Sequence, residues 1–168
     1  MEYIYEYDSP MGRLTMSSDG ECLTGLWVEN QKYFKSTLGS EFEKKQLGVF
    51  NDAIVYLERY FKGEKPELNF CLKPKGSAFR QKIWQMLLEI PYGETATYGK
   101  IAKVLEAETG KRVSAQSVGG AIGHNPILIL VPCHRVIGSD GSLTGYAGGI
   151  DKKQYLLDLE RSIHNGII

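Results

Sequence analysis

The hydrophobic pattern of the chain changes near residues 72–76, and this change constrains the fold more than any other feature. Before it, short apolar runs are separated by turn sequences, which is typical of β-strands. After it, apolar residues recur every three or four positions, which is typical of amphipathic helices. The stretch between them, "KPKG", has the Pro, Gly and Lys content of a linker. We therefore predict an α+β protein with two domains, residues 1–75 and residues 76–168.

The first domain is expected to be a small antiparallel sheet with one helix. "YIYEY" alternates and is rich in aromatic residues, and "MGRLTMSS" and "CLTGLWVE" follow after the turn sequences "SPMG" and "SDGE". In "LGVFNDAIVYLERYFKG", Phe50, Ile54 and Leu57 lie on one helical face, and Gly63 ends the helix.

The second domain is expected to be mainly helical. "SAFRQKIWQMLLEIPYG" predicts a helix capped by Ser77, with Phe79 on its inward face. Two short helices follow in "TYGKIAKVLE" and "SAQSVGGAIGHN", joined by a turn that contains Gly110. Such a pair is a candidate helix-turn-helix. The last helix, "DKKQYLLDLERSIHN", is expected to place Tyr155 and Leu156 against the core.

Composition narrows the class of protein. Apolar residues make up 42% of the chain and charged residues 24%, which is typical of a globular protein. No apolar run approaches the roughly 18 residues of a membrane span, and "MEYIYEYDSP" lacks the pattern of a signal peptide, so we expect a cytoplasmic protein. Residues 1–71 carry a net charge of −4 and residues 72–168 one of +4. This asymmetry fits binding of an anion such as nucleic acid, or attraction between the two halves.

The three cysteines differ in their surroundings. An odd number without a CxxC spacing argues against a disulfide framework and against a zinc site, so we expect no metal ion. Cys22 and Cys71 lie in strand-like sequence and are expected to be core residues. Cys133 is different, because His134 follows it directly.

The segment "ILVPCHRVIG" at residues 129–138 places a thiol beside an imidazole. A thiol attacks as thiolate, and at a pKa of about 8.5 only a few per cent is ionised at neutral pH. His134 could remove the proton if a carboxylate holds the imidazole in the right tautomer. Glu160 and Asp158 on the last helix are both candidates. From these residues alone, a Pro132 turn with a core cysteine explains the segment equally well.

The wider sequence around this segment resembles a known family. "PCHRV" at 132–136 is similar to the active-site signature of the O6-alkylguanine-DNA alkyltransferases. "FRQKIWQMLLEIPYGETATYGKIA", "SVGGAIGHNP", "GYAGG" and "YLLDLE" stand in the family's order and at its spacing. The resemblance is close over about residues 76–161. It covers residues 1–71 in outline and implies a ribonuclease H-like fold there.

The resemblance implies direct-reversal DNA repair without a cofactor. An alkyl group, such as methyl, passes from O6 of guanine to Cys133, irreversibly and once per molecule. His134 is expected to act as the base through a water, with Glu160 orienting it and Asn125 bracing the site. Tyr98 is expected to protonate N3 of the leaving guanine, which makes the leaving group neutral.

The same resemblance implies a monomer that binds double-stranded DNA through the minor groove and flips the alkylated nucleotide. Helix 114–124 is expected to enter the groove. The residues expected to contact DNA or the flipped base are Arg112, Gln116, Ser117, Gly119, Gly120, Ala121, Val131, Tyr146 and Ala147. Gln116 stands where the family often carries an arginine, so we expect weaker or differently balanced DNA binding with the chemistry retained.

Three other functions compete with this interpretation. Alkyltransferase-like lesion binders lack the acceptor cysteine, which is present here as Cys133. A cysteine hydrolase would need an oxyanion hole, which displacement at a saturated carbon does not. A plain DNA-binding regulator would leave "PCHRV" unexplained. Arg135 is expected to have a structural role, bridging the two halves of opposite charge.

Overall fold

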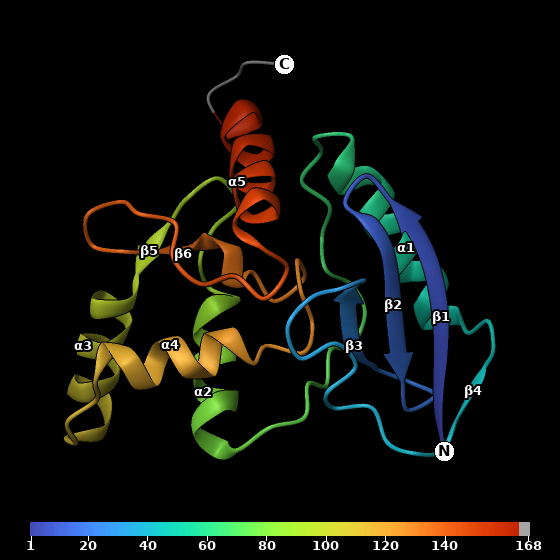
Figure 1. The fold of residues 1–168 in the computed structure, drawn as a ribbon, viewed down its shortest axis with the longest axis horizontal. Helices are drawn as coiled ribbons and strands as arrows, with labels where there is room; N and C mark the ends of the chain where they lie inside the picture. The colour runs from blue at the N-terminus through green and yellow to red at the C-terminus, as the bar shows by residue number, and fades with distance from the viewer. Residues whose placement is uncertain (165–168) are drawn as a thin grey trace.

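The computed structural model describes residues 1–164, with the backbone alone for residues 163 and 164. Two halves lie side by side: a sheet with one helix, and a group of helices with α5 between the halves (Figure 1). The first half contains β1 (Glu2–Ser9), β2 (Gly12–Ser18), β3 (Leu23–Val28), β4 (Phe42–Lys44) and α1 (Gly48–Phe61). The second contains α2 (Ala78–Leu87), β5 (Ala96–Thr97), α3 (Tyr98–Thr109), α4 (Ala115–Gly123), a 3₁₀ turn (Cys133–Arg135), β6 (Val136–Ile137) and α5 (Ile150–His164). This confirms the predicted α+β class.

The N-terminal sheet has the strand order β3-β2-β1-β4. The pairs β1–β2 and β2–β3 are antiparallel, as predicted. The short strand β4, which was not predicted from the sequence, pairs in parallel with β1 and extends the sheet at this edge. The cause is the long connection after β3, which carries the chain to the far edge before it pairs.

The helices of the second half begin where their capping residues predict. The side chains of Ser77, Thr97 and Ser114 each accept a hydrogen bond from a backbone N–H in the first turn of the following helix. Gly110 ends α3 in the left-handed conformation, at φ 71°. α3 and α4 pack against each other, which confirms the helix-turn-helix.

The two halves share one hydrophobic core. Leu26 in β3 donates its N–H to the Pro126 carbonyl at 2.8 Å and accepts the Leu128 N–H at 3.0 Å. Buried side chains run continuously from the sheet and α1 through this junction to α2, α4 and α5. The segment that leads to Cys133 is therefore anchored directly to the sheet of the other half.

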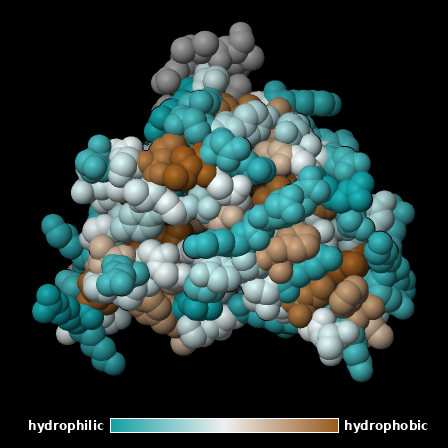
Figure 2. All heavy atoms as spheres, in the orientation of Figure 1, coloured by the Kyte–Doolittle hydropathy of each residue, from teal (hydrophilic) through white to brown (hydrophobic). Residues whose placement is uncertain are grey.

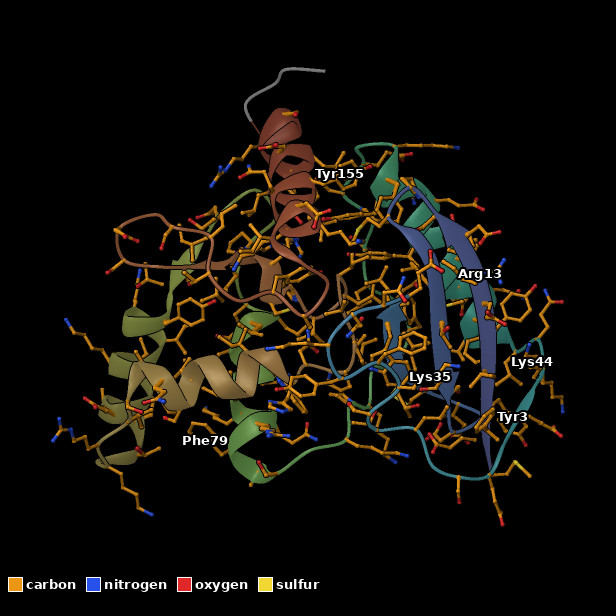
Figure 3. The ribbon with its side chains drawn as sticks, in the orientation of Figure 1. Tyr3, Arg13, Lys35, Lys44, Phe79 and Tyr155 are labelled. Atoms are coloured by element: carbon orange, nitrogen blue, oxygen red, sulfur yellow. A yellow bond between two sulfur atoms is a disulfide. The ribbon has the colours of Figure 1, made fainter. Side chains whose placement is uncertain are left out.

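Two residues predicted to face the core lie at the surface. Phe79 on α2 is 38% exposed, and Tyr155 on α5 is also 38% exposed (Figure 3). Tyr155 stacks on Phe61 of α1, with ring centroids 6.4 Å apart, so it contacts the other half at the edge of the molecule. The helical spacing marked the correct face, but both side chains stand at the margin of that face.

Cys22 and Cys71 form a disulfide, so their assignment as unbonded core cysteines was wrong. The N–H of Leu23 donates to the Cys71 carbonyl at 2.8 Å, and the N–H of Lys73 donates to the Leu23 carbonyl at 2.8 Å. This short parallel bridge places the two cysteine Cα atoms 4.6 Å apart. Cys71 is exposed, and Cys22 is partly buried.

The surface is mixed in character. On the face shown in Figure 2, hydrophobic residues form separate patches among hydrophilic ones. Within residues 1–164, every helix is too short or too polar to cross a membrane.

Candidate active site

The Cys133 thiol lies in a tight turn, and hydrogen bonds hold the segment that precedes it. Pro132 leads into the 3₁₀ turn, and the Cys133 N–H donates to the Val131 carbonyl at 2.8 Å. The side-chain amide of Asn125 donates to the same carbonyl at 2.8 Å and accepts the Ile127 N–H at 3.0 Å. Asn125 is buried. Through these two hydrogen bonds it holds the backbone at both ends of the apolar segment from Ile127 to Val131, which precedes the thiol.

Cys133 is a free cysteine and only 3% exposed. Burial raises the pKa of its thiol to about 11, against smaller opposite effects of the Asn125 amide and the Lys153 ammonium. The resting group at neutral pH is therefore the thiol. Any reaction at this sulfur needs a base that takes the proton as the new bond forms.

His134 is fully buried and paired with Glu160. Its Nε2 lies 2.6 Å from Oε2 of Glu160, which selects the tautomer with the proton on Nε2. Burial lowers the pKa of the imidazole, although Glu160 acts in the opposite direction. Nδ1 has no hydrogen-bond partner among residues 1–164, and in this tautomer it is a proton acceptor. His134 and Glu160 therefore resemble a general base and the carboxylate that orients it.

Glu160 is 1% exposed and is surrounded by donors. Burial alone would raise the pKa of its carboxyl group, but hydrogen bonds and charge from His134 and Arg135 lower it well below the ordinary value. Asp158, the other carboxylate considered, is exposed and accepts a hydrogen bond from Gln154.

Arg135 does not bridge the two halves, so that prediction was wrong. Its Nε donates to Oε1 of Glu160 at 2.8 Å, and its Nη1 donates to the Ile90 carbonyl at 2.7 Å. Its guanidinium also lies over the ring of Tyr92, 5.7 Å from the centroid. All three contacts lie within residues 76–168. The cation belongs to the carboxylate site because a buried carboxylate requires a partner.

A cavity of about 570 Å³ opens between α4, the loop before α5 and the N-terminal half. Of the predicted contact residues, Tyr98, Gln116, Gly119, Gly120, Tyr146 and Ala147 line it. The Tyr98 hydroxyl donates to the Thr144 carbonyl at 2.8 Å. Tyr146 is 8% exposed, and its hydroxyl has no hydrogen-bond partner in the described part of the chain. Burial raises the pKa of both phenols, and Cys133 acts in the same direction.

The other predicted contact residues lie outside the cavity lining. Ser117 is exposed on α4, whereas Ala121, one turn later on the same helix, is buried. The Trp84 Nε1–H on α2 donates to the Ala121 carbonyl at 2.9 Å, which fixes α4 in place. Val131 is buried, and its carbonyl accepts the Asn125 hydrogen bond described above. Arg112 is exposed in the turn between α3 and α4.

Sequence reasoning missed seven of the lining residues, and three of these carry a basic or aromatic side chain. Lys32 and Tyr33 reach the cavity from the loop after β3, and His124 lines it at the end of α4. The Tyr33 and His124 rings stack with centroids 4.0 Å apart. The available signal was "QKYFK", a loop sequence that mixes basic and aromatic residues, which is typical of nucleic-acid contacts.

Lys153 was also missed. Its side chain is fully buried, and its ammonium donates to the carbonyls of Val136 at 2.5 Å and Thr144 at 3.2 Å. Burial lowers the pKa of this ammonium. It ties β6 to the loop that carries Tyr146. The signal was a lysine at an inward position of α5, seven residues before Glu160.

Across residues 1–164, the structure brings together no cluster of His, Cys, Asp or Glu side chains that could hold a metal ion.

The sequence and the fold of this chain are similar to those of known proteins. The family model "6-O-methylguanine DNA methyltransferase, DNA binding domain" matches residues 78–162, and the model of the same family's ribonuclease-like domain matches residues 3–74. The methylated-DNA–protein-cysteine methyltransferase of Haemophilus influenzae is 46% identical over 160 residues, covering 95% of this chain and 86% of the relative. That of Methanosarcina acetivorans is 39% identical and covers 95% and 99%. The crystal structure of Mycobacterium tuberculosis OGT in complex with DNA has a TM-score of 0.85 at 43% identity, covering 96% of this chain and 94% of that one. The chain therefore belongs to the 6-O-methylguanine DNA methyltransferase family.

Proposed function

We propose that the protein repairs O6-alkylguanine in DNA by moving the alkyl group to Cys133. The observation that carries the proposal is a buried free thiol, next in the chain to the His134–Glu160 pair, in a protein with a cavity lined by Tyr98 and Tyr146. The relatives named above are methylated-DNA–protein-cysteine methyltransferases, which supports this activity over lesion binding or hydrolysis.

The proposed reaction is a single displacement at carbon. His134 takes the thiol proton at Nδ1, directly or through a water, and the sulfur attacks the alkyl carbon as its bond to O6 breaks. The electrons of that bond pass to the guanine, and Tyr98 protonates the base at N3 and becomes a phenolate. The proton that His134 took from the thiol then returns Tyr98 to its neutral form through solvent. The products are a thioether on Cys133 and unmodified guanine, so electrons balance without a cofactor. Because the thioether is stable, each molecule acts once.

Tyr98 and Tyr146 suit a base-binding pocket. The Tyr98 hydroxyl already faces an acceptor, the Thr144 carbonyl, and an entering guanine would take the place of that acceptor. The Tyr146 hydroxyl is buried and unpaired within residues 1–164, so a bound base edge would satisfy it. Ala147 lines the same pocket, and we propose that the backbone at Val131, which lies outside the cavity lining, contacts the bound base.

We further propose that α4 enters the minor groove as the protein binds, as a monomer, to a duplex. A side chain added at Gly120 would meet nothing within 4 Å, so the packing of the protein itself does not explain this glycine. An open helix backbone permits close approach to the sugar-phosphate walls. Gln116 and Ser117 are exposed on the same helix, and Arg112 lies just before it. The expected compartment is the cytoplasm.

Mass spectrometry tests the proposed acceptor. The protein is incubated with a duplex that carries one O6-methylguanine and is then digested with trypsin. The peptide spanning residues 113–135 should gain one methylene, localised to Cys133 by fragmentation, at one equivalent per protein. An unmodified peptide in a protein that still binds the duplex would instead indicate a lesion binder.

A further inference from the structure

The Glu160 carboxylate receives a hydrogen bond from the other half of the protein. Within residues 76–168, His134 and Arg135 hydrogen-bond to it, and the Gly93 N–H donates to its Oε1 at 3.1 Å. The remaining donor is Tyr60 in α1, whose hydroxyl lies 2.5 Å from Oε2. Among the described residues of the N-terminal half, Tyr60 alone reaches this carboxylate.

The position of Tyr60 is fixed by its neighbours. The residue is 1% exposed. Its ring packs edge-on against Phe61 and Tyr92, at centroid distances of 5.5 and 6.0 Å, and parallel to Tyr56 at 6.4 Å. A phenol held this way has little freedom, so the direction of its O–H is set by the packing of α1.

Tyr60 and His134 share one oxygen of Glu160. Oε2 accepts the Tyr60 hydroxyl at 2.5 Å and the His134 Nε2–H at 2.6 Å. Arg135 contacts the same oxygen at a longer 3.2 Å. A neutral donor on Oε2 holds the carboxylate in the orientation that His134 needs. It also withdraws part of the negative charge that would otherwise stabilise an imidazolium.

We propose that Tyr60 is a positioning residue for the His134 base, and that the N-terminal half contributes to alkyl transfer through this hydrogen bond. The proposal rests on the proposed function, because it assigns Tyr60 to the same reaction. Tyr60 does not touch the thiol or the substrate. It sets the position and basicity of Glu160, and Glu160 sets the tautomer and pKa of His134.

Tyr60→Phe removes only the hydroxyl and keeps the ring packing. Tyr60, His134 and Arg135 contact Glu160. Tyr56, Tyr92 and Tyr146 interact with the charge of Glu160, and Lys153 acts on His134. Without the Tyr60 hydroxyl, more of the charge on Oε2 is available to His134, so the pKa of the imidazole rises. Because only neutral His134 can accept the thiol proton, the acid limb of the transfer rate moves to higher pH.

The experiment measures single-turnover methyl transfer from an O6-methylguanine duplex between pH 5 and pH 8, together with duplex affinity. In the wild type, where burial lowers the pKa of His134 below 6.5, the rate should fall only below that pH. Tyr60→Phe should lower the rate at pH 7.5 by about 10-fold, move the acid limb upward and leave the duplex affinity unchanged.

Tyr56→Phe is the matched control, because Tyr56 lies one turn earlier on α1 and makes no hydrogen bond to Glu160. It should retain the wild-type rate and pH profile. A Tyr60→Phe protein with the wild-type rate and pH profile would overturn the proposal. So would a rate loss that is equal at every pH and is matched by Tyr56→Phe.

A second measurement does not depend on alkyl transfer. The nitrogen-15 shifts of the His134 ring, recorded without DNA, report its tautomer and its titration midpoint. The wild type should carry the proton on Nε2, and Tyr60→Phe should raise the midpoint, while Tyr56→Phe should not. If the wild type transfers no methyl group, the proposed function fails. If it does, and the His134 midpoint is the same in Tyr60→Phe, only the role of Tyr60 fails.

Discussion

At the scale of single residues, the site depends on one buried carboxylate. Glu160 is 1% exposed, and the side chain of Arg135, its cationic partner, is 10% exposed. A buried charge is tolerated only beside an opposite charge. Removing Arg135 or Glu160 would leave the other charge buried and unpaired, which destabilises the folded protein. The expected role of Arg135 changes accordingly, from a bridge between halves to a support for the proposed base.

Arg135→Ala should destabilise the protein by roughly 3–5 kcal/mol at pH 7 and should slow methyl transfer as well. The pKa of Glu160 is lowered in the folded protein, so its ionic contacts contribute stability above the ordinary pKa of 4.5, and this is lost as the pH falls below that value. The difference between variant and wild type should therefore narrow below about pH 4.5. Urea denaturation at several pH values measures it.

Arg13→Ala is the control for that experiment. The side chain of Arg13 is 55% exposed, and its contacts with Glu6 and Asp8 lie at the surface, so its loss should destabilise the protein much less than the loss of Arg135. Equal losses for the two variants would show that the Arg135–Glu160 pair has no special weight.

At the scale of helices and strands, the sequence predicted correctly those features that depend on residues close together in the chain. The Ser77 cap and the turn at Gly110 involve only a few neighbouring residues, so the local sequence was sufficient to predict them. The parallel strand β4 and the Cys22–Cys71 bond depend on where a long loop returns, which no local pattern encodes. Tyr60 was missed for the same reason, because its partner is 100 residues away.

Helix α4 gives the next prediction. Gln116 is exposed on this helix and lines the cavity. Gln116→Arg should tighten binding to a duplex at fixed salt. If the new guanidinium pairs with a phosphate, the salt dependence of log Kd should steepen by about 0.9, as expected for one added phosphate contact. Titration of a labelled duplex at several salt concentrations measures both.

The matched control is Gln154→Arg, which adds the same charge at an exposed position on α5, outside the cavity lining. It should change affinity less than Gln116→Arg does. An unchanged or weaker affinity for Gln116→Arg would contradict the assignment of α4 as the DNA-binding element.

At the scale of the molecule, the two predicted domains share one core and contact each other beside the reaction site. Leu26 binds the chain before Cys133, and Tyr60 binds Glu160. Sequence reasoning placed the boundary near residue 76 from a change of period, and that boundary stays a prediction. The sequence pattern could not predict the contacts between the two halves. Hydrophobic periodicity indicates which face of a helix or strand is buried, but not which element packs against that face.

The Cys22–Cys71 bond gives a prediction about the whole molecule. It joins the start of β3 to the segment that leaves the N-terminal half, across a sequence separation of 49 residues. On the chain-entropy model, a closed loop of this length stabilises the folded state by roughly 4 kcal/mol. Reduction should therefore lower the Tm by about 10 °C. Methyl transfer at 25 °C should be unchanged, because Cys133 is not part of the bond.

Calorimetry of oxidised and reduced protein, with a count of free thiols, measures the effect. Cys71→Ser should melt at the Tm of the reduced wild type under both conditions, since it lacks the bond in either. Equal melting temperatures for oxidised and reduced wild type would show that the bond adds no stability. If the loss of stability is as large as expected, a reducing cytoplasm would hold this protein in its less stable form. Its lifetime there would then depend on the shared core and on the contacts made by Leu26 and Tyr60.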